Sequence, residues 1–422
     1  MNAELVERLK TIVGDEWVIA DGEKIRGYLY DETPEHLRPK AAGEVVVVKP
    51  RSPEEVSKIL KLANELKVPV FPRGGGTGLV GGCVPTLSGI AISLERMKNI
   101  AIDRDNLIAE AEAGVTLAEL IEAAEKAGLF FPLHPGDEGA QIGGLIACNA
   151  GGVRAIKTGV MRNYVKGVEV VLPTGEIITL GGKILKNNAG YDLMHLIIGS
   201  EGTLGIITKA WIRLQSRPRV SATIIIPFDD RRKALRIVPE IFREAIIPIA
   251  VEYIEKTLAD QAAEELGLTW PCREGEYQLM IILTENSEED LIAHCEKLLN
   301  LCRRFDASEP LFAERREDQE KILKILSDLH LAVEKGLVDI LDATVPPARM
   351  VELIEAVEEI AKKKCTRIPV FGHAGDGNLH IHIMEEKGWS EEDYEELRDE
   401  IYEKVIRLGG TITGEHGVGY TR

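Results

Sequence analysis

The first part of the chain alternates short apolar runs with amphipathic stretches, a pattern that predicts strands and helices in turn. Val45–Lys49 predicts a buried strand, and apolar residues at helical spacing then predict a helix from Pro53 to about Lys67. Ser52 and Glu55 have the spacing of a capping box, and proline at the first helical position supports the same start. Val68–Phe71 predicts the next strand.

The same alternation continues for another hundred residues. Thr116 and Glu119 form a second predicted capping box, before an alanine-rich helix that ends at Gly128. Val168–Leu172 predicts a strand, and the Pro-Thr-Gly that follows at 173–175 is a turn signal. We expect one unit of mixed helices and strands up to about Leu214.

After Arg217-Pro218 the predicted elements become longer. Strands are expected at Thr223–Ile226, Gln278–Leu283 and Val338–Thr344, and long amphipathic helices at Ser287–Phe305 and Pro347–Lys364. Strands with interleaved helices indicate a second, α+β domain. The expected organisation is therefore two domains, 1–214 and 215–422.

Composition excludes several classes of partner. The 422 residues carry a formal net charge of -18, which disfavours nucleic acid and anionic membrane surfaces. No apolar run approaches the ~18 residues that span a bilayer, and the acidic, helix-like start is not a signal peptide. The six cysteines form no Cys-x-x-Cys pair, so neither a zinc ribbon nor an iron–sulfur cluster is expected. Reduced cysteines indicate a cytoplasmic protein.

A glycine-rich loop at Gly74–Gly82 contains the spacing G-x-G-x-x-G of a dinucleotide-binding fingerprint. That fingerprint requires a helix to open at the loop. Gly82-Cys83-Val84-Pro85 cannot begin such a helix well, so a Rossmann fold is rejected. The loop still offers clustered backbone N–H groups and Arg73, which suit a pyrophosphate.

Two more stretches are rich in glycine. They are Pro135–Gly152 and Asn187–Gly205. Glycine is used where the backbone must approach a ligand closely or take a positive φ. Three such stretches in one unit indicate an extended cofactor that is touched along its length.

These motifs resemble the FAD domain of the vanillyl-alcohol oxidase superfamily. The resemblance is carried by Pro72–Leu79, by Ile142–Gly144 with Asn149–Gly152, and by Gly199–Gly205. It is strongest to the branch of glycolate oxidase catalytic subunits, D-lactate dehydrogenases and D-2-hydroxyglutarate dehydrogenases. The fold it implies is α+β, with a two-subdomain FAD-binding domain of the p-cresol methylhydroxylase type and an α+β cap or substrate domain.

The resemblance implies non-covalent FAD, because Thr77 stands where relatives with covalent flavin carry histidine. The implied FAD contacts are Arg73, Gly74, Gly75, Gly76, Thr77, Gly78, Pro135, Gly136, Gly143, Gly144, Asn149, Gly151, Glu201, Gly202 and Ile206.

Three of the chain's nine histidines lie within ten positions, at 373, 380 and 382. His380 and His382 lie on a strand-like run, Leu379–Met384, where alternate residues share a face. Imidazole and carboxylate together suit borderline divalent metals. The glycines around them, and Gly414–Gly417 later, indicate a metal site with a spare base.

The resemblance sharpens this reading through the motif Gly-His-x-Gly-Asp-Gly-Asn-Leu-His and the later Gly-Glu-His-Gly. It implies that His373, His380 and Glu415 bind Fe²⁺, Zn²⁺ or Mn²⁺, and that His416 is the general base. An imidazole of ordinary pKa accepts a proton near neutrality. His382 stands where relatives often carry asparagine.

The implied enzyme is an FAD- and metal-dependent dehydrogenase that oxidises a D-2-hydroxy acid, with D-lactate as the leading substrate. Glycolate and D-2-hydroxyglutarate remain open as substrates. A non-redox enzyme of the alkyl-dihydroxyacetone-phosphate synthase type should lack the metal turn, and a non-catalytic flavin subunit should lose the histidines. Electrons would pass to a partner protein, either an electron-transferring flavoprotein, an iron–sulfur subunit or a cytochrome.

Two positions depart from the family pattern. The arginine that grips the substrate carboxylate in relatives aligns with Leu326, with only Lys324 and Arg315-Arg316 nearby. Relatives also continue beyond Gly-Glu-His-Gly with a helix and an Asn-Pro-Gly segment, whereas this sequence stops at Arg422.

Overall fold

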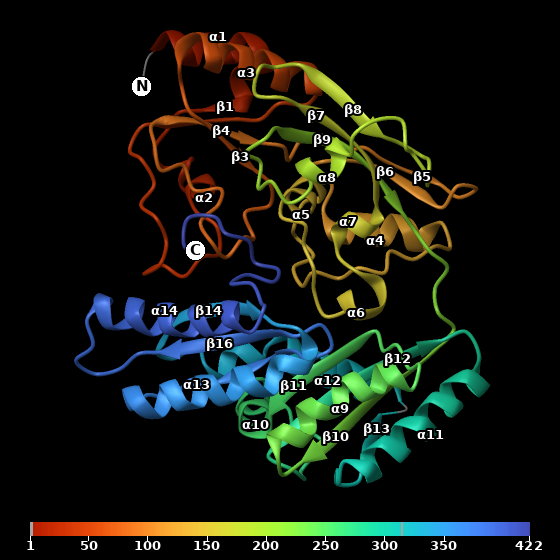
Figure 1. The fold of residues 1–422 in the computed structure, drawn as a ribbon. Helices are drawn as coiled ribbons and strands as arrows, with labels where there is room; N and C mark the ends of the chain where they lie inside the picture. Colours follow the sequence, from red (N-terminus) through yellow and green to blue (C-terminus); the bar gives the residue numbers. More distant parts are fainter. Residues whose placement is uncertain (1–2, 314) are drawn as a thin grey trace. The chain divides into compact units, whose positions relative to one another are not determined.

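A computed structural model describes residues 3–313 and 315–422, with only the backbone of Arg316. The chain divides into two compact units. Unit 1 holds the chain up to Gly152, together with Gly159–Arg217 and Glu415–Arg422. Unit 2 holds Val153–Thr158 and Pro218–Gly414. Figure 1 follows the chain from red to blue.

The elements of unit 1 mix short helices with strands. Its helices are α1 (Ala3–Val13), η1 (Asp15–Trp17), α2 (Arg26–Leu29), α3 (Pro53–Leu66), α4 (Leu117–Lys126), α5 (Ile142–Ala147), α7 (Met161–Tyr164) and α8 (Leu193–Ile197). Its strands are β1 (Val18–Ile19), β2 (Val45–Val48), β3 (Val70–Arg73), β4 (Gly89–Ser93), β5 (Ile100–Asp103), β6 (Ile108–Glu112), β7 (Val165–Val171), β8 (Ile177–Gly181) and β9 (Ile206–Arg213).

Unit 1 contains two sheets, as a two-subdomain FAD-binding domain requires. The first has the order β1-β2-β4-β3, in which β2, β4 and β3 are parallel. The second has the order β5-β6-β9-β7-β8 and is antiparallel. Helices α1 and α3 bury apolar faces on the first sheet, and α4 and α5 on the second. The expected α+β class is confirmed.

Unit 2 is built on one large sheet. Its helices are α6 (Ala155–Thr158), α9 (Arg231–Arg243), α10 (Lys256–Glu265), α11 (Glu288–Arg304), α12 (Arg316–Ser327), η2 (Leu329–Ala332), η3 (Pro347–Arg349), α13 (Met350–Lys364) and α14 (Glu391–Arg407). Its strands are β10 (Val220–Phe228), β11 (Ala250–Glu255), β12 (Tyr277–Glu285), β13 (Leu311–Ala313), β14 (Leu337–Thr344), β15 (Val370–His373) and β16 (Asn378–Met384).

The sheet of unit 2 has the order β13-β10-β12-β11-β15-β16-β14, with all neighbours antiparallel. Side chains alternate across it. Ile224 and Ile226 of β10 pack with α9, α11, α13 and α14, whereas Ile225 packs with α10 and α12 on the other face. Both faces are therefore covered by helices. Among the described residues, no helix combines the length and apolarity needed to cross a bilayer.

Most predicted elements exist, with shifted ends. Strand β3 runs from Val70 to Arg73, later than expected, and β10 and β12 extend beyond the predicted runs on both sides. The capping box at Thr116 and Glu119 is complete. The one at Ser52 is only half formed, because the Glu55 carboxylate accepts from the N–H of Arg51 instead. No helix follows the glycine loop; β4 is the next element, so rejecting the Rossmann fold was correct.

Candidate functional site

The glycine-rich stretches of unit 1 line a single cavity of about 290 Å³. Strand β3 delivers Arg73 and the loop after it, α5 brings Gly143 and Gly144, and the turn before β9 brings Gly202. All the implied FAD contacts line this cavity except Gly136 and Asn149. Glu415 and His416 also line it.

Two close backbone approaches explain why glycine is needed in the loop. Gly76 has φ +78°, and a Cβ there would lie 2.1 Å from Nη2 of Arg73. A Cβ on Gly75 would lie 2.8 Å from the carbonyl oxygen of Gly139. At Gly144 a Cβ would meet no described atom within 4 Å, so a side chain there would project into the cavity that this residue lines. The loop is thus a surface formed by backbone, open to a ligand.

Arg73 is buried beneath this loop. Its guanidinium donates to the carbonyl oxygens of Tyr30 and Gly27, at 2.8 and 3.1 Å, and lies 3.2 Å from the Cys83 sulfur. Thr33 adds a second contact between the N-terminal segment and the loop, because its Oγ1 accepts from the N–H of Gly81 at 2.7 Å. The N-terminal segment around residues 27–33 therefore fixes the loop from behind.

Two buried acceptors face the cavity without a partner among the described residues. Oδ1 of Asp31 accepts from the N–H of Thr33 at 3.2 Å, but its Oδ2 has no hydrogen bond, and neither does Oε1 of Gln141. Both residues are more than nine-tenths buried. Buried acceptors are costly when unsatisfied. A ligand that presents hydroxyl and N–H donors would satisfy them, as the sugar, ribityl and ring groups of FAD do. The sequence analysis did not single out either residue.

The sheet of unit 2 gathers four chemically active side chains on one face. Glu252 pairs with His373 across β11 and β15, and Asp342 pairs with His380 across β14 and β16. Strands β15 and β16 are themselves neighbours. All four positions share the sheet face covered by α10 and α12, because their strand neighbours in sequence point to the opposite core.

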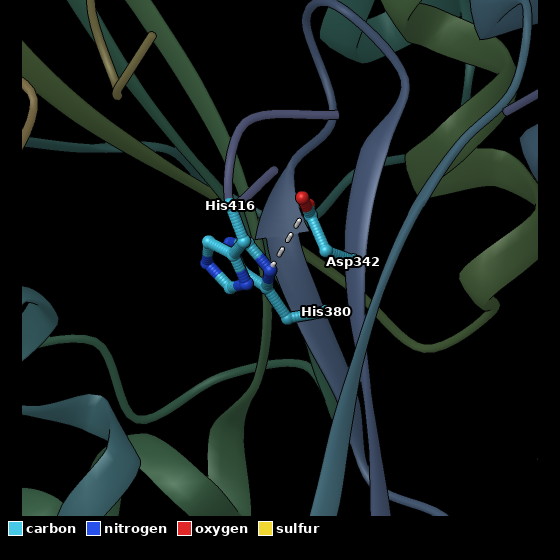
Figure 2. Close-up of side chains that lie close together, drawn as sticks. All are labelled: Asp342, His380 and His416. Atoms are coloured by element: carbon cyan, nitrogen blue, oxygen red, sulfur yellow. Dashed lines mark ion pairs between the residues drawn. The ribbon is translucent and has the colours of Figure 1, made fainter. Parts of the chain in front are cut away.

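Each histidine has a carboxylate beside Nδ1. The Nδ1 of His373 lies 2.9 and 2.8 Å from the two carboxylate oxygens of Glu252, and both residues are buried. The Nδ1 of His380 lies 3.8 Å from Oδ1 of Asp342, the ion pair marked in Figure 2. A carboxylate at Nδ1 leaves Nε2 for a metal. The sequence analysis missed both carboxylates, whose only signal is a charged residue within an apolar strand.

The spacing of the two rings fits a shared metal ion. The ring centroids of His373 and His380 are 5.2 Å apart. Two imidazoles bound to a tetrahedral ion at a metal–nitrogen distance of about 2.1 Å would have their centroids roughly 5 Å apart. The donor set of imidazoles backed by carboxylates also suits a borderline divalent metal.

His382 lies on the same strand face but has another environment. It is buried, its ring stacks on Phe371 with centroids 4.3 Å apart, and Nδ1 is 3.3 Å from the carbonyl oxygen of Pro369. Stacking on Phe371 gives it a packing role.

Asp342 also fixes the segment that follows α14. Its carboxylate is fully buried and accepts from Asn378 Nδ2 at 2.7 Å, Thr413 Oγ1 at 3.0 Å and the N–H of Gly414 at 2.9 Å. The next residue along the chain is Glu415, and then His416, which Figure 2 also draws. The segment that Asp342 fixes therefore continues directly into Glu415 and His416, which line the cavity.

The expected anchor for the substrate carboxylate is absent at the aligned position. Leu326 lies on α12 and packs against the hydrophobic cluster beneath α10 and α12. Lys324 of the same helix is exposed. The side chain of Arg316 lies outside the described residues.

Comparison with known proteins gives a consistent result. Residues 45–181 match the family model "FAD binding domain", and residues 217–422 match "FAD linked oxidases, C-terminal domain". The D-lactate dehydrogenase of Archaeoglobus fulgidus is 44% identical over 93% of this chain and 87% of its own. The glycolate oxidase subunit GlcD of Bacillus subtilis is 38% identical over 93% of this chain and 83% of its own.

A solved structure supports the fold independently. The substrate complex of p-cresol methylhydroxylase superposes with a TM-score of 0.78 at 16% identity, covering 98% of this chain and 89% of the other. At that identity the likeness concerns the fold alone.

Proposed function

Because this chain belongs to the family of FAD-linked dehydrogenases and oxidases, we propose that it oxidises a D-2-hydroxy acid, specifically D-lactate, to the 2-oxo acid. The observation that carries the proposal is that Gly414 and Glu415 are adjacent in the sequence. The N–H of Gly414 donates to Asp342, the carboxylate beside His380, and Glu415 lines a cavity whose glycine-rich lining suits FAD.

In this proposal the backbone of Gly74–Gly78, the start of α5 at Gly143-Gly144 and the turn at Gly202 hold FAD without a covalent bond. The remaining contacts are Arg73, Pro135, Gly136, Asn149, Gly151 and Ile206. Asp31 Oδ2 and Gln141 Oε1 accept from donor groups of the cofactor. FAD, when bound, supplies the two-electron acceptor for the hydride that leaves C2 of the substrate.

His373, His380 and Glu415 would hold a divalent metal, which would supply a Lewis acid for the substrate hydroxyl. Glu252 holds the ring of His373 through Nδ1, and Asp342 lies 3.8 Å from Nδ1 of His380, so Nε2 of each ring is available. A ring nitrogen of His416 takes the proton of the substrate hydroxyl oxygen.

The direct test is anaerobic mixing of purified protein with D-lactate, L-lactate, glycolate or D-2-hydroxyglutarate while flavin absorbance is followed. We expect bleaching with D-lactate fastest and none with L-lactate. Absence of bleaching with every hydroxy acid would refute the proposal. Bleaching fastest with glycolate or D-2-hydroxyglutarate would keep the chemistry and change the substrate.

Reoxidation requires an acceptor protein, which we propose to be an electron-transferring flavoprotein or an iron–sulfur subunit. The described cysteines are all free and no second redox centre is encoded. Free thiols are typical of a reducing compartment, which supports the cytoplasm as the location.

Glu252→Gln tests the support of His373. The neutral amide accepts a weaker hydrogen bond from Nδ1 of His373 and no longer raises the basicity of the ring. Metal affinity should therefore fall about 10–100-fold. Metal content after dialysis against graded chelator would measure this. Glu255→Gln, three residues further along the same strand, is the matched control. Equal metal retention in the Glu252 variant and wild type would contradict the role of Glu252.

Cys148 provides a test of where FAD binds. This cysteine is exposed and lines the cavity, but the surrounding protein, and then the Glu201 carboxylate, raise its pKa to about 11. Since only the thiolate reacts, alkylation by iodoacetamide should be slow at pH 8 and accelerate about tenfold per pH unit up to pH 10. FAD should protect Cys148 but not the exposed Cys365. Equal labelling of Cys148 with and without FAD would contradict the proposed FAD position.

A further inference from the structure

The segment Glu415–Arg422, here called the strap, belongs to unit 1 although it follows unit 2 in the sequence. It is fixed there by Glu201 (Figure 1 shows the strap as the last blue segment). Oε1 of Glu201 accepts from the N–H of Val418 at 2.9 Å, and Oε2 accepts from the N–H of Gly419 at 2.8 Å. A carboxylate that accepts from two successive backbone N–H groups makes strong, charge-assisted hydrogen bonds.

Glu201 is itself held in a special backbone conformation. Its φ is +51°, in the left-handed region that non-glycine residues seldom adopt, and its N–H donates to the carbonyl oxygen of Ala147 at 2.8 Å. This conformation follows α8 and directs the side chain to the strap. Backbone outliers of this kind gather at functional sites, and this one accompanies a specific contact.

The strap fits closely against the glycine loop on its other side. The N–H of Tyr420 donates to the carbonyl oxygen of Val80 at 2.7 Å. A Cβ on Gly419 would lie 2.3 Å from that oxygen, and a Cβ on Gly417 would lie 3.2 Å from Oε1 of Glu201. The two glycines after His416 are thus required by the docking of the strap.

We infer that Glu201 is a positioning residue, which docks the strap so that Glu415 and His416 are held at the cavity wall. This inference rests on the proposed function. Both carboxylate oxygens of Glu201 accept from the strap, and the residue also lines the cavity, where the resemblance implies an FAD contact. In this inference Glu201 places the proposed base and the proposed metal ligand, and it does not touch the reacting atoms.

The first measurement is amide hydrogen exchange in the full-length, FAD-loaded protein. Glu201→Ala should raise the exchange rates of the Val418 and Gly419 amides at least about tenfold. Glu201→Gln keeps one acceptor oxygen and should retain part of the protection. Glu122→Gln, on the exposed side of α4, is the control and should change neither amide. Unchanged exchange in Glu201→Ala would overturn the inference.

The second measurement is kinetic. Displacement of a catalytic group by about 1 Å can cost 10²-fold in rate. Glu201→Ala should therefore slow substrate reduction of the flavin about 10–100-fold, with FAD affinity within about threefold of wild type and with Glu201→Gln intermediate. If Glu201→Ala weakens FAD binding at least tenfold while the strap amides stay protected, Glu201 contacts FAD and the inference fails. Lost protection with an unchanged reduction rate would also overturn it.

Gly419→Ala should also undock the strap, because its Cβ would collide with Val80 and does not touch Glu201. Its effect on reduction should equal that of Glu201→Ala, and the double variant should be no slower than either single one. Additive losses would overturn the inference. If wild-type flavin is reduced by no hydroxy acid, the proposed function fails, whereas hydrogen exchange and FAD affinity still report on the strap.

Discussion

His416→Ala is expected to bind FAD normally and to reduce it with D-lactate about 10²–10⁴ times more slowly than wild type. A positioned general base contributes that range, and the loss falls on the chemical step because the substrate hydroxyl keeps its proton. Anaerobic stopped-flow absorbance measures the reduction directly. Added imidazole should restore part of the rate, since the truncated side chain leaves room at the cavity wall that His416 lines.

The matched control is His330→Ala, an exposed histidine on η2. It should retain the wild-type rate. Normal bleaching in the His416 variant would exclude this residue as the base. Loss of FAD from the His416 variant would show instead that His416 supports the cavity.

The second large effect concerns the metal. His380→Ala should lose the metal and with it the reduction of flavin, because one of the two imidazole ligands is gone. Metal analysis and stopped-flow absorbance of the same sample measure both. Chelation of wild type should have the same effect on rate, reversed by Fe²⁺, Zn²⁺ or Mn²⁺.

His382→Asn separates the ligand role from packing. His382 shares the strand face of His380 but stacks on Phe371, so its loss should cost about 1–2 kcal/mol of stability and leave the metal content unchanged. Thermal unfolding and metal analysis distinguish the two. Metal loss from this variant, or full activity in metal-free His380→Ala, would contradict the assigned ligand set.

The fold could be predicted where a local rule determines it. The complete capping box at Thr116, the helix at Glu288–Arg304 with Ser287 as its N-cap, and the buried strand at Val45–Val48 each follow from a few adjacent residues. Strand ends could not be predicted, because pairing decides them. Strand β10 extends to Phe228 since β12 supplies a partner at every position.

Some residues of the candidate site could be predicted from the sequence and others could not. Glycine loops and clustered histidines are visible in the sequence because their composition is unusual. Glu252 and Asp342 each share a strand with a second acidic residue, and only the register of distant strands places them beside His373 and His380. Glu201 contacts Val418 and Gly419, more than 200 residues later, and no local pattern shows such a contact.

The strap also determines when unit 1 can finish folding during synthesis. Residues 218–414 must be synthesised before the strap emerges, which takes about 10–40 s at typical elongation rates of roughly 5–20 residues per second. Until then Glu201 and the carbonyl of Val80 lack their native partners. Newly made chains should accordingly bring Glu415 and His416 to the cavity wall only after residues 218–414 have been synthesised.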